Sequence, residues 1–294
     1  METLLMTFQM LNYLVALEKY RHFNRAAKAC RVGQPTLSEQ IRKLEAELGG
    51  PLLERTSRKV VFTQEGVRLV RQAQKILYEL RRLHDLVERQ RDPLSGLLHL
   101  GIVRSCAPYL LPHVIPPLRR RFPDLHLRFY EGNRHSLLPQ LESGKLDALV
   151  LACQPEDAPV AIPLFDEPLL LALNYRHPWA GRHTVTPDML SELDDLTLAE
   201  DDELPPAFSA VRQKAQIHGR LSANLELLRS QLASCTGAGL FPRLAATPMT
   251  GVCYIPFQPA LTRTLFMIWR GDMRDLRYRC VASTIHATMR RLLV

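Results

Sequence analysis

The stretch "AAKACRVGQPTLSEQIRKLEAELG", residues 26–49, reads as two short helices joined by a tight turn. Asn24 is a residue type that caps helices, and a first helix is expected from there to about Cys30. The next helix, about residues 34–48, carries one apolar stripe, since its leucines and isoleucine recur at intervals of 4, 3 and 4: Leu37, Ile41, Leu44 and Leu48. Two helices joined by a glycine-containing turn form the helix-turn-helix pattern.

The second helix has a polar side that points away from the stripe. Its candidate DNA-contacting residues are Gln34, Pro35, Thr36, Ser38 and Arg42. In a helix-turn-helix the second helix enters the major groove, where Gln pairs with adenine and Arg with guanine or phosphate. Double-stranded DNA is therefore the expected partner, although a plain amphipathic helix pair would give the same stripe.

A basic hairpin is expected directly after these helices. In "LLERTSRKVVFTQEG", residues 52–66, the cations Arg55, Arg58 and Lys59 lie near a turn and "VVF" continues as a strand. A basic turn beside a recognition helix suits a wing that contacts phosphates or the minor groove.

A long helix should follow, with Thr63 as its cap and Glu65 in its first turn. Its apolar residues recur at 4, 3, 4, 3 and 4 and so form a heptad seam: Leu69, Ala73, Ile76, Leu80, Leu83 and Val87. We expect this seam to pair two chains as a homodimer through residues 64–93, so that two recognition helices address two half-sites. Alternatively, the seam packs on the chain's own body.

Charge is concentrated in the first third of the chain. Residues 1–93 hold 17 Lys and Arg against 11 Asp and Glu, or +6, and the other 201 residues hold 21 against 19, or +2. A polyanionic partner would favour this bias, and a solvated basic surface would also explain it.

The sequence shows no pattern typical of a cofactor site or of a membrane protein. The six cysteines are scattered without a CxxC or a Cys/His spacing suited to zinc, so no metal and no cofactor is expected. No apolar run approaches the roughly 18 residues that span a bilayer. The first residues also lack a basic region and a cleavage site typical of a signal peptide. The expected location is the cytoplasm, with no membrane partner.

The rest of the chain alternates strands and helices, which predicts a parallel α/β sheet. Strands are expected at 97–103, 125–129 and 147–153, and helices at about 108–122 and 135–143. Residues 163–173 look like a crossover into a second lobe, and 256–269 like the return. A last helix carries an apolar side that should close the first lobe: Tyr278, Val281, Ile285, Met289 and Leu292.

The sequence resembles the LysR-type transcriptional regulators over nearly its whole length, and most closely their OxyR branch. The matching stretches include "RHFNRAA", "LLERTSRKV", "CAPYLLPHVIP", "SGKLDALVLA", "PLFDEPLLLA" and "HPWA". The resemblance implies a winged helix-turn-helix at 1–63, a linker helix at 64–93, and a two-lobed, periplasmic-binding-protein-like effector domain at 94–294. Lobe I would span about 94–164 and 265–294, and lobe II about 165–264. It also implies a homotetramer, with RNA polymerase as a further partner.

The OxyR branch senses peroxide with a pair of cysteines in the second lobe, and this chain departs from that pattern. In "LAEDDELPPAF" the place of the first cysteine falls on Glu203, and that of the second falls near Arg212. Neither side chain can perform thiol chemistry. A thiol switch relocated to Cys106 or Cys235 is the alternative.

A small-molecule effector is therefore expected between the lobes, beyond the carboxyl ends of the strands. The candidate effector-binding residues are Arg104, Ser105, Cys106, Arg134, Glu203 and Asn224. By the resemblance, Ser105 matches the hydroxyl residue that OxyR uses for peroxide, whereas Arg104 and Arg134 are departures. Two arginines at a pocket mouth suggest an anion, although arginines that only solvate the rim, or a regulator without an effector, remain alternatives.

Two other classes of protein are disfavoured. A thiol peroxidase would need an activated cysteine beside a base, and no such arrangement is evident in the sequence. A transport-type binding protein would need a signal peptide. The expected function is thus that of a DNA-binding transcriptional regulator, not an enzyme.

Overall fold

The computed structural model describes residues 6–54, 60–89, 94–152, 160–199, 213, 221–234 and 237–293. The chain divides into two compact units, one formed mainly by residues 1–91 and the other by 92–141 and 146–294. Within the described ranges, no helix combines the length and the apolar character needed to cross a membrane.

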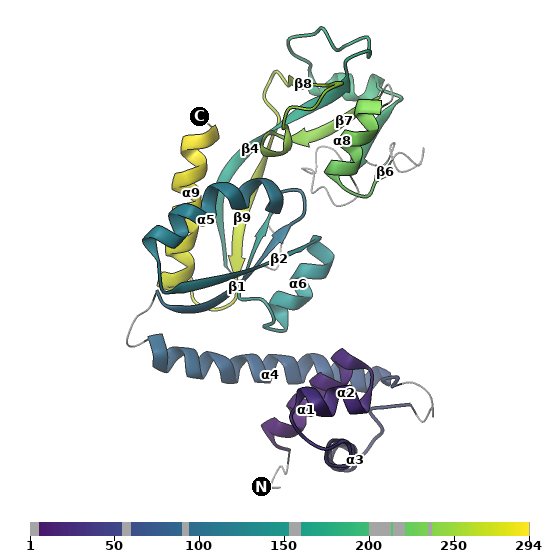
Figure 1. Ribbon diagram of the computed structural model, residues 1–294, viewed down its shortest axis with the longest axis vertical. Coiled ribbons are helices and arrows are strands. Elements are labelled where there is room, and N and C mark those ends of the chain that lie inside the picture. Colours follow the sequence, from purple (N-terminus) through teal and green to yellow (C-terminus); the bar gives the residue numbers. More distant parts are fainter. Residues whose placement is uncertain are drawn as a thin grey trace. The chain divides into compact units, whose positions relative to one another are not determined.

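The first unit is built from four helices: α1 (Phe8–Tyr20), α2 (Phe23–Ala29), α3 (Gln34–Leu48) and α4 (Gln64–Arg89) (Figure 1). The core they share includes Leu14, Leu17, Leu37, Ile41 and Leu44, each no more than 1% exposed. The predicted bounds of α3 are confirmed. The predicted cap of α2 is wrong, because the helix begins at Phe23 after His22 and Asn24 lies inside its first turn.

The predicted seam of α4 is divided between the core and the surface. Leu69 and Ala73 pack on the core of their own unit, together with Val70 and Leu77, which lie beside the seam. Leu83, by contrast, is 60% exposed. The expectation that the whole seam is left to pair with another chain is thus wrong for its first part, because α1 already covers that part of the helix.

The second unit consists of two lobes joined by long strands. Its strands are β1 (Gly96–Val103), β2 (Leu125–Gly132), β3 (Ala148–Leu151), β4 (Val160–Asn174), β5 (Leu196–Ala199), β6 (Leu221–Ser222), β7 (Ala238–Pro242), β8 (Val252–Pro256) and β9 (Thr262–Trp269). The helices are α5 (Ala107–Arg121), α6 (Arg134–Glu142), α8 (Leu225–Ser234) and α9 (Leu276–Leu293), with the short turns η1 (Pro187–Glu192) and η3 (Arg243–Ala245).

The strand order is β2-β1-β3-β9-β4-β7-β5-β6, with β8 also paired to β4. β1 is parallel to β2 and β3, but β9 runs antiparallel to both β3 and β4. The sheet is thus mixed and not parallel as predicted, because β9 returns from the second lobe against the direction of β4. These two long strands connect the lobes (Figure 1).

Lobe I has its own core, against which α5 and α9 pack. The apolar side predicted for the last helix is confirmed for Tyr278, Val281, Ile285 and Met289, which are all buried, whereas Leu292 is 45% exposed. Lobe II holds two smaller clusters, one of which lies around α8 and includes Leu228 and Phe241. Two separately packed lobes on shared strands leave room for a cavity between them.

Candidate functional site

The polar side of α3 faces solvent. Gln34, Pro35, Thr36 and Arg42 are exposed, and Ser38 is half-buried and accepts a hydrogen bond from Arg42 Nη2 at 3.3 Å. Pro35 lies in the first turn, where its missing N–H leaves no helical bond unmade. The predicted separation of polar and apolar sides is confirmed, except that Leu48 at the end of the stripe is 43% exposed.

A hairpin follows α3, as the sequence predicts. Leu53 and Phe62 form an antiparallel bridge, and the Glu54 N–H donates to the Val61 carbonyl oxygen at 2.9 Å. The Thr63 hydroxyl oxygen accepts from the Gly66 N–H at 3.0 Å, so the predicted cap of α4 is confirmed. The basic residues expected at the tip, Arg55, Arg58 and Lys59, lie outside the described residues.

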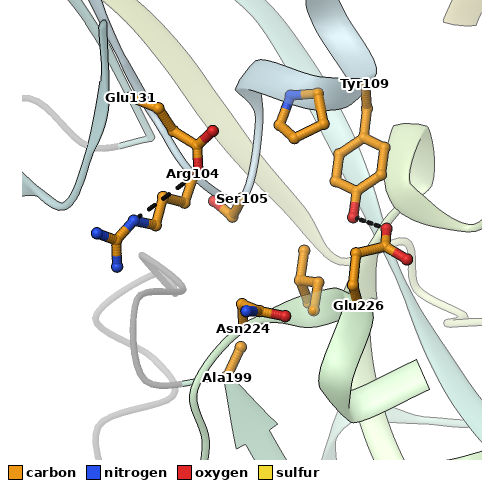
Figure 2. Close-up of a pocket in the computed structure, with 9 residues that line it drawn as sticks. Arg104, Ser105, Tyr109, Glu131, Ala199, Asn224 and Glu226 are labelled. Atoms are coloured by element: carbon orange, nitrogen blue, oxygen red, sulfur yellow. Dashed lines mark hydrogen bonds and ion pairs between the residues drawn. The ribbon is translucent and has the colours of Figure 1, made fainter. Parts of the chain in front are cut away.

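A cavity of about 240 Å³ lies between the two lobes of the second unit (Figure 2). From lobe I come the loop after β1, the start of α5 and the end of β2. From lobe II come the end of β5 and the start of α8. The lining residues are Arg104, Ser105, Pro108, Tyr109, Glu131, Ala199, Asn224, Leu225 and Glu226. Of the predicted effector residues, the structure brings together Arg104, Ser105 and Asn224.

Ser105 is fixed by a buried arginine. Arg263 Nη1 donates to the Ser105 hydroxyl oxygen at 2.8 Å, and Nη2 donates to the Ser105 carbonyl oxygen at 3.1 Å. The guanidinium also pairs with Glu167 at 2.9 Å, and the two side chains are 0% and 1% exposed. Because the Ser105 oxygen already accepts from Arg263, its own O–H is left to donate to a ligand.

Asn224 holds the start of α8. Its side-chain oxygen accepts from the Leu227 N–H at 2.8 Å, the usual geometry of a helix cap. The amide nitrogen is thereby left as a donor at the lower side of the cavity in Figure 2. Ser105 and Asn224 thus place an uncharged hydrogen-bond donor on the cavity from each lobe.

Tyr109 and Glu226 meet across the cavity from opposite lobes. The Tyr109 hydroxyl donates to Glu226 Oε1 at 2.5 Å, and Glu226 Oε2 pairs with Arg229 Nη1 at 3.1 Å. Arg229 is 7% exposed and lies between the rings of Tyr109 and Phe241. Burial, and then the hydrogen bond to the Glu226 carboxylate, raise the pKa of Tyr109, so its hydroxyl stays protonated and donates.

Arg104 lies opposite this contact and faces a carboxylate. Its Nε is 3.8 Å from Glu131 Oε1, and both side chains are about half exposed. This side of the cavity, where the sequence predicts arginines, therefore presents a pair of opposite charges.

The other three predicted effector residues are not among the described residues that line the cavity. Cys106 is 0% exposed in the core of lobe I and does not line the cavity, because the loop after β1 turns its side chain inward. Arg134 begins α6 and is not among the lining residues. Glu203 lies outside the described residues, as do Arg212 and Cys235.

Sequence reasoning missed Tyr109, Glu131, Glu226, Arg229 and the Arg263–Glu167 pair. The pair had a signal, because "DEPLLLAL" and "LTRTLFMIW" each place a charge in an otherwise apolar strand. Tyr109 and Glu226 had none, since they are 117 residues apart and nothing local marks their contact.

Comparison with known proteins matches both units. The sequence pattern described as "Bacterial regulatory helix-turn-helix protein, lysR family" matches residues 8–67, and the LysR substrate binding domain matches residues 91–290. The chain is 45% identical over 295 residues to the "DNA-binding transcriptional dual regulator OxyR" of Escherichia coli K12, covering 97% of this chain and 96% of that protein. It is 42% identical to the "Hydrogen peroxide-inducible genes activator" of Haemophilus influenzae, covering 98% and 99%.

Solved structures agree with this similarity. A full-length OxyR variant from Pseudomonas aeruginosa superposes with a TM-score of 0.72 at 31% identity, covering 97% of this chain and 95% of that one. The oxidized form of OxyR matches 69% of this chain and 100% of its own, with a TM-score of 0.59 at 35% identity. The chain therefore belongs to the LysR family of DNA-binding transcriptional regulators and is homologous to OxyR.

Proposed function

We propose that this regulator binds promoter DNA through α3 and that a small molecule in the inter-lobe cavity, not a disulfide, controls that binding. One observation carries the proposal: Ser105 and Asn224 present hydrogen-bond donors to one cavity from opposite lobes. A ligand that accepts from both would favour one relative placement of the lobes, and its effect is limited by its difference in affinity for the two placements.

The donors favour an anionic group on the effector. The Ser105 O–H, the Asn224 amide and the Arg104 guanidinium all suit a carboxylate or another oxyanion. Arg134 plays no part in this proposal, because it does not line the cavity.

The experiment is a metabolite screen on the full chain. DNA fragments selected by the protein from a random pool serve as operator, and each compound is scored both by thermal shift and by operator affinity. A true effector raises the melting temperature by mass action and changes the operator affinity. Ser105→Ala should weaken both effects, and Ser191→Ala, an exposed serine in η1, should leave them unchanged. A screen in which no compound moves either readout contradicts the proposal.

A peroxide-responsive regulator with a relocated cysteine is the second candidate. It is favoured by the relatives, several of which are described as hydrogen peroxide-inducible genes activators. The discriminating measurement is mass spectrometry after mild peroxide treatment. The main proposal expects no intramolecular disulfide and an unchanged operator affinity, whereas a disulfide that changes this affinity would establish the second candidate.

A further inference from the structure

The inter-lobe cavity has more kinds of polar group than an anion requires. The inference drawn from them rests on the proposed function. Beside its donors the cavity has acceptors. The Tyr109 O–H is donated to Glu226, so the lone pairs of the Tyr109 oxygen are left to accept. Glu226 Oε1 accepts from Tyr109 and Oε2 pairs with Arg229, and each carboxylate oxygen has a lone pair for another hydrogen bond.

The charges that the described residues bring to the cavity balance one another. Among the described residues the lining has one cation, Arg104, and two carboxylates, Glu131 and Glu226. Arg229 stands behind Glu226 and compensates the second carboxylate. A dianion would meet two like charges here, whereas a ligand with one charge of each sign would meet an opposite charge at both ends.

Donors and acceptors lie close together on each lobe. On α8, Asn224 and Glu226 are two residues apart at the start of the helix, so a donor and an acceptor share its first turn. On lobe I, Ser105 comes two residues before α5 begins at Ala107, and Tyr109 lies in the first turn of α5. Figure 2 shows Ser105 and Asn224 facing each other at the middle, with Tyr109 and Glu226 together on one side. The two groups of the ligand must therefore be neighbours.

We propose that the effector is a small zwitterion of the α-amino acid type, whose carboxylate accepts from Ser105 and Asn224 and whose ammonium donates to Glu226. Pro108, Leu225 and Ala199 supply the apolar lining for its side chain. The cavity of about 240 Å³ is smaller than the roughly 300–1,000 Å³ of drug-sized sites, which suits a ligand of this size. Because Ser105 and Asn224 belong to opposite lobes, the carboxylate of the ligand joins the lobes, and its ammonium adds a contact to lobe II at Glu226.

The test uses the full chain and calorimetry with the twenty proteinogenic amino acids. Each amino acid that binds is compared with its counterpart acid lacking the amine and its counterpart amine lacking the carboxylate. At least one amino acid should bind, and each counterpart should bind roughly tenfold or more weakly, as expected for losing a charged hydrogen bond. If no amino acid binds, or if the acid without the amine binds equally well, the zwitterion is overturned.

Glu226→Gln separates recognition from folding. This variant should bind the amino acid roughly tenfold or more weakly and should bind the acid without the amine with unchanged affinity. Glu192→Gln, an exposed carboxylate at the end of η1, is the matched control and should change neither. If Glu226→Gln lowered the affinity for both ligands equally, the role of Glu226 would be merely structural, and its assignment as the partner of the ammonium would be overturned. An acid without an amine that binds and changes operator affinity would overturn the zwitterion yet leave the proposed function standing.

Discussion

The guanidinium of Arg263 is a buried charge that joins three segments. It donates to Ser105 in lobe I and pairs with Glu167 on β4, and Glu167 Oε1 accepts from the Leu244 N–H in lobe II at 2.9 Å. A buried ion pair adds little net stability compared with apolar side chains, but removing one partner leaves the other charge without compensation. The pair therefore fixes where the cavity wall stands.

Glu167→Gln tests this position. The variant leaves Arg263 buried without its counter-charge, so the free energy of unfolding of the effector domain should fall by about 3–5 kcal/mol. Urea unfolding of the full chain, followed by tryptophan fluorescence, measures the change. Asp166→Asn is the matched control, since Asp166 is the exposed neighbour and accepts a hydrogen bond from the Thr264 hydroxyl at 2.6 Å. Equal stability of the two variants would contradict the role given to the pair.

Cys30, Cys106 and Cys253 should react slowly in the native protein. Cys106 is 0% exposed, and burial raises the pKa of the Cys30 and Cys253 thiols. The nucleophile is the thiolate, whose population falls as the pKa rises. In the native protein near neutral pH, maleimide should leave Cys106 unmodified and should modify Cys30 and Cys253 more slowly than free glutathione. Peptide mapping against a urea-denatured control measures this, and rapid labelling of native Cys106 would revive the relocated thiol switch.

At the scale of elements, α4 and the hairpin touch at Gly66. A Cβ added there would lie 2.2 Å from the Leu52 carbonyl oxygen and 3.1 Å from Phe62 Cδ1. Alanine is the better helix former by about 1 kcal/mol, but a clash with backbone outweighs that gain. Gly66→Ala should destabilise the first unit by roughly 1–3 kcal/mol.

Thermal unfolding by circular dichroism measures the effect. Gly50→Ala is the matched control, because an added Cβ at Gly50 meets nothing within 4 Å. The account expects a lower melting temperature for Gly66→Ala only, and a loss shared equally by both variants would speak against the close approach.

The exposed part of α4 carries the prediction of a dimer. Ile76 and Leu83 are 37% and 60% exposed, although both belong to the apolar seam. Leu83→Glu should lower the molar mass measured by light scattering, because a charge in the paired seam destabilises the dimer. Gln72→Glu adds the same charge at an exposed position off the seam and should leave the mass unchanged. An unchanged mass for Leu83→Glu would place the interface elsewhere.

Local patterns predicted the elements well, and contacts between distant segments escaped them. The bounds of α3 and the cap Thr63 follow from periodicity and capping chemistry, which act over a few residues. The antiparallel return of β9 does not, because strand direction depends on where the chain travels between strands. In the same way Ser105 and Asn224 could be named singly, whereas their common cavity with Tyr109 and Glu226 required the packed lobes.

For the whole molecule, we propose that the exposed side of α3 reads promoter DNA and that a small molecule in the inter-lobe cavity controls this binding. Membership of the LysR family and homology to OxyR fit both parts. The polar side of α3 is the feature on which regulation depends, because an effector has nothing to control unless this helix reads DNA.

The most direct test is operator binding by side-chain variants at physiological salt. Arg42→Ala should weaken binding by roughly tenfold and alter the preferred bases, because Arg42 lies on the exposed side of α3. Arg58→Ala should weaken binding to all DNA sequences alike, as expected when a phosphate contact is lost. Lys19→Ala, which removes a cation from the last turn of α1, is the control and should bind as the wild type does. Unchanged isotherms and unchanged base preference for both arginine variants would contradict the account.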